Sequence, residues 1–140
     1  MKPSFKPSII AAALGGVTAA FINSILYFLF HAAGIIPNNV YVRENQPMSV
    51  VPVIFSSIVP SLLAGVVFYL LCRYTRNGHR VFSIIAIILL LLSFANPFVA
   101  IEGVPLGMAL ALDVMHIVVV ASLPYFFTRM KGAESKIALR

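Results

Sequence analysis

Four long apolar segments dominate this chain of 140 residues and restrict its fold more than any other feature. Each is long enough to cross a bilayer, which takes about 20 apolar residues in a helix. The predicted spans are residues 8–33, 48–74, 81–101 and 105–127. A mean hydropathy of +1.01 lies far above that of a soluble domain with a polar surface. The sequence therefore predicts an all-α integral membrane protein with a single domain over residues 1–140.

Positive charge is distributed unevenly between the connections of these spans. Lys and Arg residues are retained on the cytoplasmic side of a membrane protein. Of the ten Lys and Arg residues, only Arg43 falls on the opposite side, which also contains Glu44 and Glu102. The others lie before the first span, between the second and third spans, and in a basic C-terminal tail over 128–140. We expect both termini in the cytoplasm.

The short connections and the small residues predict how the spans pack. Short loops favour sequential antiparallel helices, which gives an up-down-up-down four-helix transmembrane bundle. In the first span small residues recur at every fourth position, with Gly15 beside them, and allow a neighbouring backbone to approach closely. This series is Ala12, Gly16, Ala20 and Ser24. The Gly15/Gly16 face is expected to meet another helix of the same chain or, in a homo-oligomer, a second subunit.

Two prolines interrupt the predicted helices. Pro60 deprives the carbonyl of Ser56 of its usual donor, so the second span is expected to kink near its centre. Pro97 is expected to end the regular helix of the third span near its outer end.

Several functional classes are disfavoured by what the sequence lacks. Cys72 is the only cysteine, so neither an intramolecular disulfide nor a CxxC redox pair can form. The basic residues flank apolar segments, where they contact lipid headgroups, so nucleic acid is not an expected partner. Motifs of phosphate-binding loops, serine nucleophiles and zinc proteases are also missing. We expect a non-enzymatic protein without a cofactor, with the lipid bilayer as its main partner.

Four polar side chains fall inside the predicted spans, namely Asn23, Asn96, Asp113 and His116. Such residues are costly in hydrocarbon, so each requires an interior partner or a water-filled pocket. The rise per residue places all four in the outer half of the bundle, where they can converge. Tyr27 lies one turn from Asn23 and can add a hydroxyl group. These five residues form the candidate site for binding a ligand or a proton.

Asp113 and His116 are three positions apart and therefore share one face of a helix. A neighbouring imidazole can share the proton of a buried carboxyl group, as an ion pair or as a neutral hydrogen-bonded pair. Three interpretations stay open: a structural hydrogen-bond network, a site for a ligand or a transported proton, and a metal or haem site. No third metal ligand is evident, because His31 lies near the outer edge, so a metal is not predicted.

Four stretches of the sequence resemble a known group of proteins: AFINSILYFLF, PSLLAGVVFYLLCRYTR, LLSFANP and MALALDVMHIVV. Together they are similar to an uncharacterised family of small bacterial four-span inner-membrane proteins, catalogued as a domain of unknown function. The resemblance covers about residues 8–125. It implies a location in the bacterial inner membrane and no activity. It implies that Asn23, Ser93, Pro97 and His116 match recurrent positions of that family.

Two functions follow from these observations as hypotheses. In the first, the protein binds a small or lipid-like molecule, or organises a membrane complex, around its buried polar cluster. In the second, it is a small proton-coupled transporter that uses Asp113 and His116. Loss of transport in an Asp113→Asn variant would distinguish the second hypothesis from the first.

Overall fold

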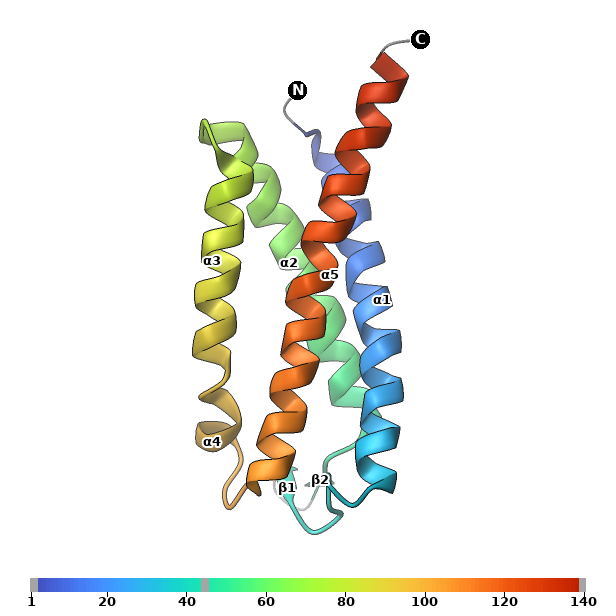
Figure 1. Cartoon of the computed structure of the whole chain (residues 1–140), viewed down its shortest axis with the longest axis vertical. Coiled ribbons are helices and arrows are strands. Elements are labelled where there is room, and N and C mark those ends of the chain that lie inside the picture. Colours follow the sequence, from blue (N-terminus) through green and yellow to red (C-terminus); the bar gives the residue numbers. More distant parts are fainter. Residues whose placement is uncertain (1–2, 44–45, 139–140) are drawn as a thin grey trace.

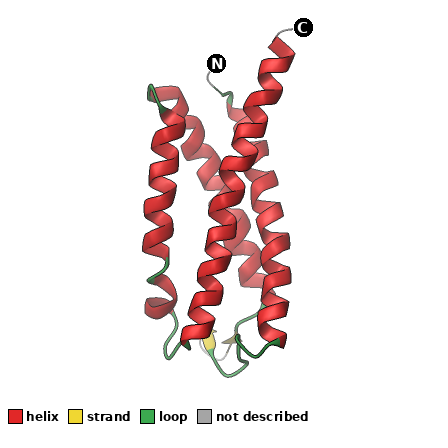
Figure 2. Ribbon diagram, viewed as in Figure 1, coloured by secondary structure: helices red, strands yellow, loops and turns green. Residues whose placement is uncertain are grey.

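Helices account for nearly all of the chain (Figures 1 and 2). The structure is a computed structural model, and it describes residues 3–43 and 46–138. In chain order the elements are α1 (Phe5–Ala32), β1 (Tyr41–Arg43), β2 (Gln46–Pro47), α2 (Val50–Tyr74), α3 (Gly78–Ser93), α4 (Asn96–Ala100) and α5 (Leu106–Ala138). Lys2, Glu44 and Arg140, which contribute to the predicted charge pattern, lie outside the described residues.

The long helices run up and down between two ends of the molecule. Both chain termini and the turn between α2 and α3 lie at one end, which we call the termini end (Figure 1). The strands and the connection from α4 to α5 lie at the other, which we call the hairpin end (Figure 1). The fold is therefore all-α apart from one short hairpin, and successive long helices are antiparallel.

Three helices are long and apolar enough to cross a membrane: α1, α2 and residues Leu106–Met130 of α5. The fourth, α3, is a shorter apolar helix of 16 residues. At about 1.5 Å per residue it extends about 24 Å, which is less than the roughly 30 Å hydrocarbon core. The chain thus has the helices of a membrane protein, with one shorter than the other three.

The third predicted span is divided in the structure. A single helix over 81–101 was expected, but α3 begins at Gly78 and ends at Ser93, and α4 starts at Asn96. Pro97 lies in the first turn of α4. Proline has no N–H and its ring clashes with the preceding turn, which disfavours the continuation of α3 through this position. The break therefore has the cause that the sequence indicates, but it falls earlier than a span to residue 101 requires.

The other boundaries differ from expectation in two places. The last helix was expected to end at 127 before a basic tail, but α5 continues to Ala138 and projects past the other helices (Figure 1). The loop after α1, for which the sequence predicts no strand, forms a small antiparallel hairpin in which Tyr41 pairs with Pro47 and Arg43 with Gln46.

The small-residue face of α1 packs against helices of the same chain. A Cβ atom added to Gly16 would lie 2.8 Å from the Cβ of Ser61 in α2, and one added to Gly15 would lie 3.3 Å from Leu123 in α5. In α2, a Cβ added to Gly65 would lie 2.5 Å from the Cβ of Ala12. The Gly15/Gly16 face is therefore filled by α2 and α5. Of the two expected alternatives, this is packing against other helices of the same chain.

Aromatic rings fill the core at the termini end. Phe68 and Phe127 are fully buried and stack in parallel with their ring centroids 4.0 Å apart. Phe82 contacts both rings edge to face, and His79 packs edge to face on Phe68. In α3 the buried residues are Gly78 and Phe82. This helix is therefore anchored mainly by its termini end and presents most of its surface outward.

Candidate functional site

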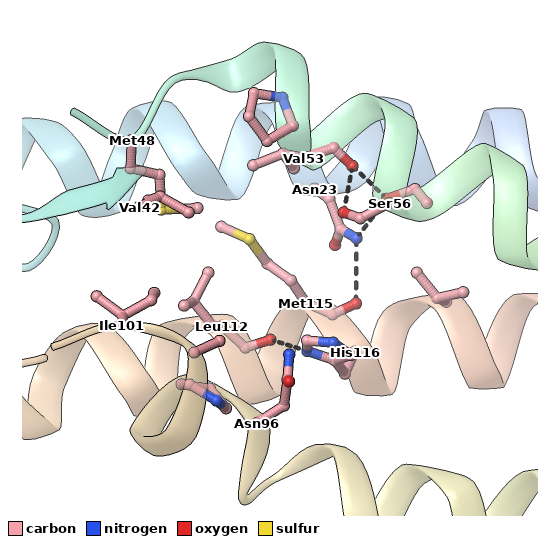
Figure 3. Close-up of a pocket in the computed structure, with 15 residues that line it drawn as sticks. Asn23, Val42, Met48, Val53, Ser56, Asn96, Ile101, Leu112, Met115 and His116 are labelled. Atoms are coloured by element: carbon pink, nitrogen blue, oxygen red, sulfur yellow. Dashed lines mark hydrogen bonds between the residues drawn. The ribbon is translucent and has the colours of Figure 1, made fainter. Parts of the chain in front are cut away.

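A cavity of about 200 Å³ lies in the half of the bundle near the hairpin end (Figure 3). Its walls come from α1, α2, α4 and α5, together with Val42 of the hairpin and Met48 just after it. The lining is mostly apolar. Its polar side chains are Asn23, Ser56, Ser57, Asn96 and His116. The structure thus brings together three residues that the sequence singles out, Asn23, Asn96 and His116.

Asn23 links three helices from a nearly fully buried position, with 2% of its surface exposed. Its amide nitrogen donates hydrogen bonds to the hydroxyl of Ser57 in α2 and to the carbonyl of Met115 in α5, both at 3.1 Å (Figure 3). The amide oxygen of Asn23 is buried and has no hydrogen-bond partner. A buried acceptor left unsatisfied carries a free-energy cost, so a group that donates to it from the cavity would be stabilised.

The serines of α2 use their hydroxyl hydrogens on their own helix. Ser56 and Ser57 both donate to the carbonyl of Val53, at 3.1 and 2.8 Å. Ser61 donates to the carbonyl of Ser57 at 2.6 Å. The hydroxyl of Ser57 also accepts the hydrogen bond from Asn23. These hydroxyl groups therefore bond the carbonyls of Val53 and Ser57 in their own helix, and Ser57 also holds Asn23 in place.

His116 lines the cavity with an imidazole whose tautomer follows from its partner. Its Nδ1 lies 2.8 Å from the carbonyl oxygen of Leu112, one turn back in α5 (Figure 3). A carbonyl oxygen can only accept, so Nδ1 must carry a hydrogen. In a neutral ring Nε2 then has no hydrogen and acts as an acceptor.

Asp113 does not line the cavity, although it lies on the same helix. Its Oδ1 is buried and has no hydrogen-bond partner. Within residues 3–43 and 46–138, no hydrogen bond joins Asp113 to His116, whose Nδ1 is committed to Leu112. The two residues are three positions apart in α5, but only His116 is among the lining residues. The hydrogen-bonded pair that we expected from this spacing is not formed.

The other two candidates occupy the edge of this region. Tyr27 is not part of the cavity lining: its hydroxyl donates to the carbonyl of Met48 at 2.8 Å, and its ring stacks on His31. It therefore ties α1 to the chain between the hairpin and α2. Asn96 lines the cavity from α4, and its side chain is exposed.

Sequence reasoning missed the contributions of the hairpin to the site. Val42 and Met48 line the cavity, but strands of three and two residues leave no periodic pattern from which their position could be predicted. Ser57 was not among the candidate residues. Its role as a partner of Asn23 depends on how α1 crosses α2, which only the packed structure provides. Among the described residues, no cluster of three or more His, Cys, Asp and Glu side chains is arranged to hold a metal ion.

The structure is an apolar helical bundle of the membrane-protein type, with a mostly apolar cavity that carries a few polar side chains in one half. Comparison with known families gives a more particular result. Residues 3–133 match the family described as "Family of unknown function (DUF6069)", and the chain belongs to this family. The resemblance to an uncharacterised family is thereby confirmed. No curated protein and no solved structure matches the chain.

Proposed function

We propose that the protein crosses the inner membrane of a bacterium four times, with both termini in the cytoplasm. The charges support this orientation, because Arg73, Arg76, Arg80 and Arg129 are all exposed toward the termini end. Arg73 also lies over the rings of Tyr69 and Tyr74, a pairing suited to the headgroup region. In this proposal α3 and α4 together cross the membrane, because α3 alone is too short to do so.

In this orientation the cavity lies in the outer half of the membrane, and its function is to bind a small or lipid-like molecule without catalysis. One observation carries the proposal: the cavity is lined by Asn23, whose buried amide oxygen lacks a partner. A purely structural network would be expected to satisfy its central residue on both amide atoms. A ligand that donates a hydrogen bond would supply the partner that the amide oxygen of Asn23 lacks. Its apolar part would contact the hydrophobic lining.

Native mass spectrometry of protein extracted from its own membrane tests this function. A bound molecule should be retained by the wild-type protein and lost from an Ala100→Phe variant, because Ala100 lines the cavity and a phenyl ring would occupy the space. Ala95→Phe is the matched control, since both alanines are exposed but Ala95 is not among the lining residues. Empty protein in every case, or equal retention in both variants, would contradict the proposal.

Proton-coupled transport is the second candidate, and one observation favours it. The buried Oδ1 of Asp113 has no partner and lies three residues from a histidine that lines the cavity. Intramembrane carboxyl groups of this kind frequently relay protons. In proteoliposomes with a trapped pH dye, proton flux should then be abolished by Asp113→Asn and retained by Glu102→Gln, whose side chain is exposed at the hairpin end. Flux that is equal to that of protein-free vesicles would remove this candidate.

A further inference from the structure

The hydrogen-bond donors on three walls of the cavity are already in use. Both amide hydrogens of Asn23 are donated, one to Ser57 and one to Met115. The hydroxyl hydrogens of Ser56 and Ser57 go to Val53. The Nδ1 hydrogen of His116 goes to the carbonyl of Leu112. A guest that needs donors from α1, α2 or α5 side chains would have to break one of these bonds.

Acceptors, in contrast, are left over on two of these walls. The amide oxygen of Asn23 is buried without a partner, and a neutral His116 retains the lone pair of Nε2. Among the residues that the structure describes, no Lys, Arg, Asp or Glu side chain lines the cavity. Asn96 carries further amide hydrogens, but its side chain is exposed, so these donors lie on the open side of the cavity and not beside the buried Asn23 oxygen. Next to a neutral His116, an anion in the interior would therefore lose its hydration without gaining a positive charge or a free buried donor.

We infer that the cavity selects a neutral or cationic amphiphile whose polar end donates hydrogen bonds, an alcohol or an amine, and that it rejects carboxylates and other anions. This inference rests on the proposed binding function and adds the chemical class of the ligand. The hydroxyl or ammonium group of the ligand donates hydrogen bonds to Asn23 Oδ1 and His116 Nε2. The hydrocarbon part contacts Leu112, Met115 and Val119.

Methionine methyl groups provide a direct readout of occupancy. The chain has five methionines, of which Met48 and Met115 line the cavity. Met108 is fully buried outside the lining, and Met130 packs near the aromatic core, so both serve as internal references. The full-length protein, labelled with ¹³C-methyl methionine, is placed in phosphatidylcholine nanodiscs, because this headgroup carries no hydrogen-bond donor. Ligand binding is then followed by the shifts of Met48 and Met115.

Four probes of equal chain length vary only the polar end: hexanol, hexylamine, hexanoate and hexane. Hexanol and hexylamine should shift Met48 and Met115 at concentrations about tenfold below those that hexanoate or hexane requires, which corresponds to one hydrogen bond. Equal affinity for all four would overturn the inferred selectivity and leave the proposed binding function standing. Unchanged Met48 and Met115 resonances with every probe would overturn the binding function itself.

Two substitutions of His116 isolate the second acceptor. In His116→Asn the amide nitrogen can replace Nδ1 in the bond to Leu112, but no atom replaces Nε2. In His116→Gln a polar atom returns near the Nε2 position. Hexanol affinity should fall about tenfold in His116→Asn and recover in His116→Gln, while Met108 and Met130 report an intact fold. Equal affinity in wild type and both variants would exclude Nε2 as an acceptor and overturn this part of the inference.

The donor-bearing group can come from a free molecule or from a lipid. Nanodiscs that contain dioleoylglycerol, which has a free hydroxyl group, distinguish these sources from phosphatidylcholine alone. Shifts of Met48 and Met115 caused by dioleoylglycerol would assign the site to a lipid hydroxyl. Shifts caused by hexanol alone would assign it to a small free alcohol or amine. Either result supports the inferred chemistry.

Discussion

The termini end of the bundle is closed by aromatic rings, whereas the hairpin end is held together by polar side chains around a cavity. At the termini end, Phe68 and Phe127 stack at 4.0 Å, and Phe82 seals them from the side. At the hairpin end, Asn23 bridges α2 and α5 through hydrogen bonds and leaves one atom unsatisfied. The same helices are therefore closely packed at one end and enclose part of a cavity at the other.

This division follows from how helices associate in lipid. Lipid tails are as apolar as a leucine core, so burying apolar surface contributes little, and close packing or hydrogen bonds must hold the helices together. Rings and small residues supply close packing at the termini end. At the hairpin end, directional hydrogen bonds hold the helices together without filling the space between them. The comparison predicts that packing variants act mainly on stability and polar variants act on both stability and binding.

The largest effect is expected for Phe68→Ala, which removes the central ring of the aromatic core. The transfer part of the usual cost is small in lipid, but the cavity part remains, at about 2–3 kcal/mol of unfolding free energy for a phenyl-sized void. Unfolding in mixed micelles of detergent and SDS measures it. Phe55→Ala is the control, because Phe55 lies on α2 with 63% of its surface exposed. Equal losses in both variants would mean that the core does not hold this end.

Gly65→Ala should come next, with a loss of about 2 kcal/mol in the same unfolding assay. The new Cβ would lie 2.5 Å from the Cβ of Ala12 and 3.2 Å from the carbonyl oxygen of Ser8, so α1 and α2 must separate. Gly107→Ala is the matched control in α5, where the nearest atom, of Ile35, would be at an ordinary 3.6 Å. Unchanged stability in Gly65→Ala would show that the helices can separate here without cost.

The sequence predicts those parts of the fold that depend on local interactions better than those that depend on contacts between distant segments. Hydropathy and length locate the helices because the cost of exposing a backbone polar group in lipid acts on each segment separately. The end of α3 was indicated by Pro97, a local cause. The hairpin was not predictable in the same way. Its strands have three and two residues, and their pairing depends on where α1 ends and α2 begins.

The candidate site was predictable to a similar degree. The cost of polar groups in hydrocarbon indicated that Asn23, Asn96 and His116 face the interior, and all three line one cavity. The same rule could not specify their partners. His116 bonds the carbonyl of Leu112 in its own helix rather than Asp113, because a carbonyl one turn back is within reach of an imidazole in any helix. Spacing predicts a shared face, but it does not predict which atoms meet.

A smaller effect, about 1 kcal/mol, is expected for Asn23→Leu, which removes two interhelical hydrogen bonds of roughly 0.6 kcal/mol each. This variant sharpens the comparison because it removes the unsatisfied acceptor as well. A binding site predicts loss of the bound molecule in native mass spectrometry together with the modest destabilisation. Ser24→Ala is the control: Ser24 donates to its own helix at Ala20 and is not among the lining residues. Destabilisation with full retention of the molecule would favour a structural network.

The smallest effect is expected for Tyr27→Phe, and it should be confined to the hairpin end. This change removes the hydrogen bond to the carbonyl of Met48 and leaves the ring free to stack on His31, so global stability should fall by only about 0.6 kcal/mol. Local opening is more sensitive, because this bond ties the segment after β2 to α1. Amide hydrogen exchange over residues 46–50 should therefore become faster, while exchange around Phe68 stays unchanged. Tyr41→Phe, an exposed change within β1, is the control. Faster exchange at both ends of the bundle would mean that the hairpin and the aromatic core open as one unit, and that the two ends are not independent.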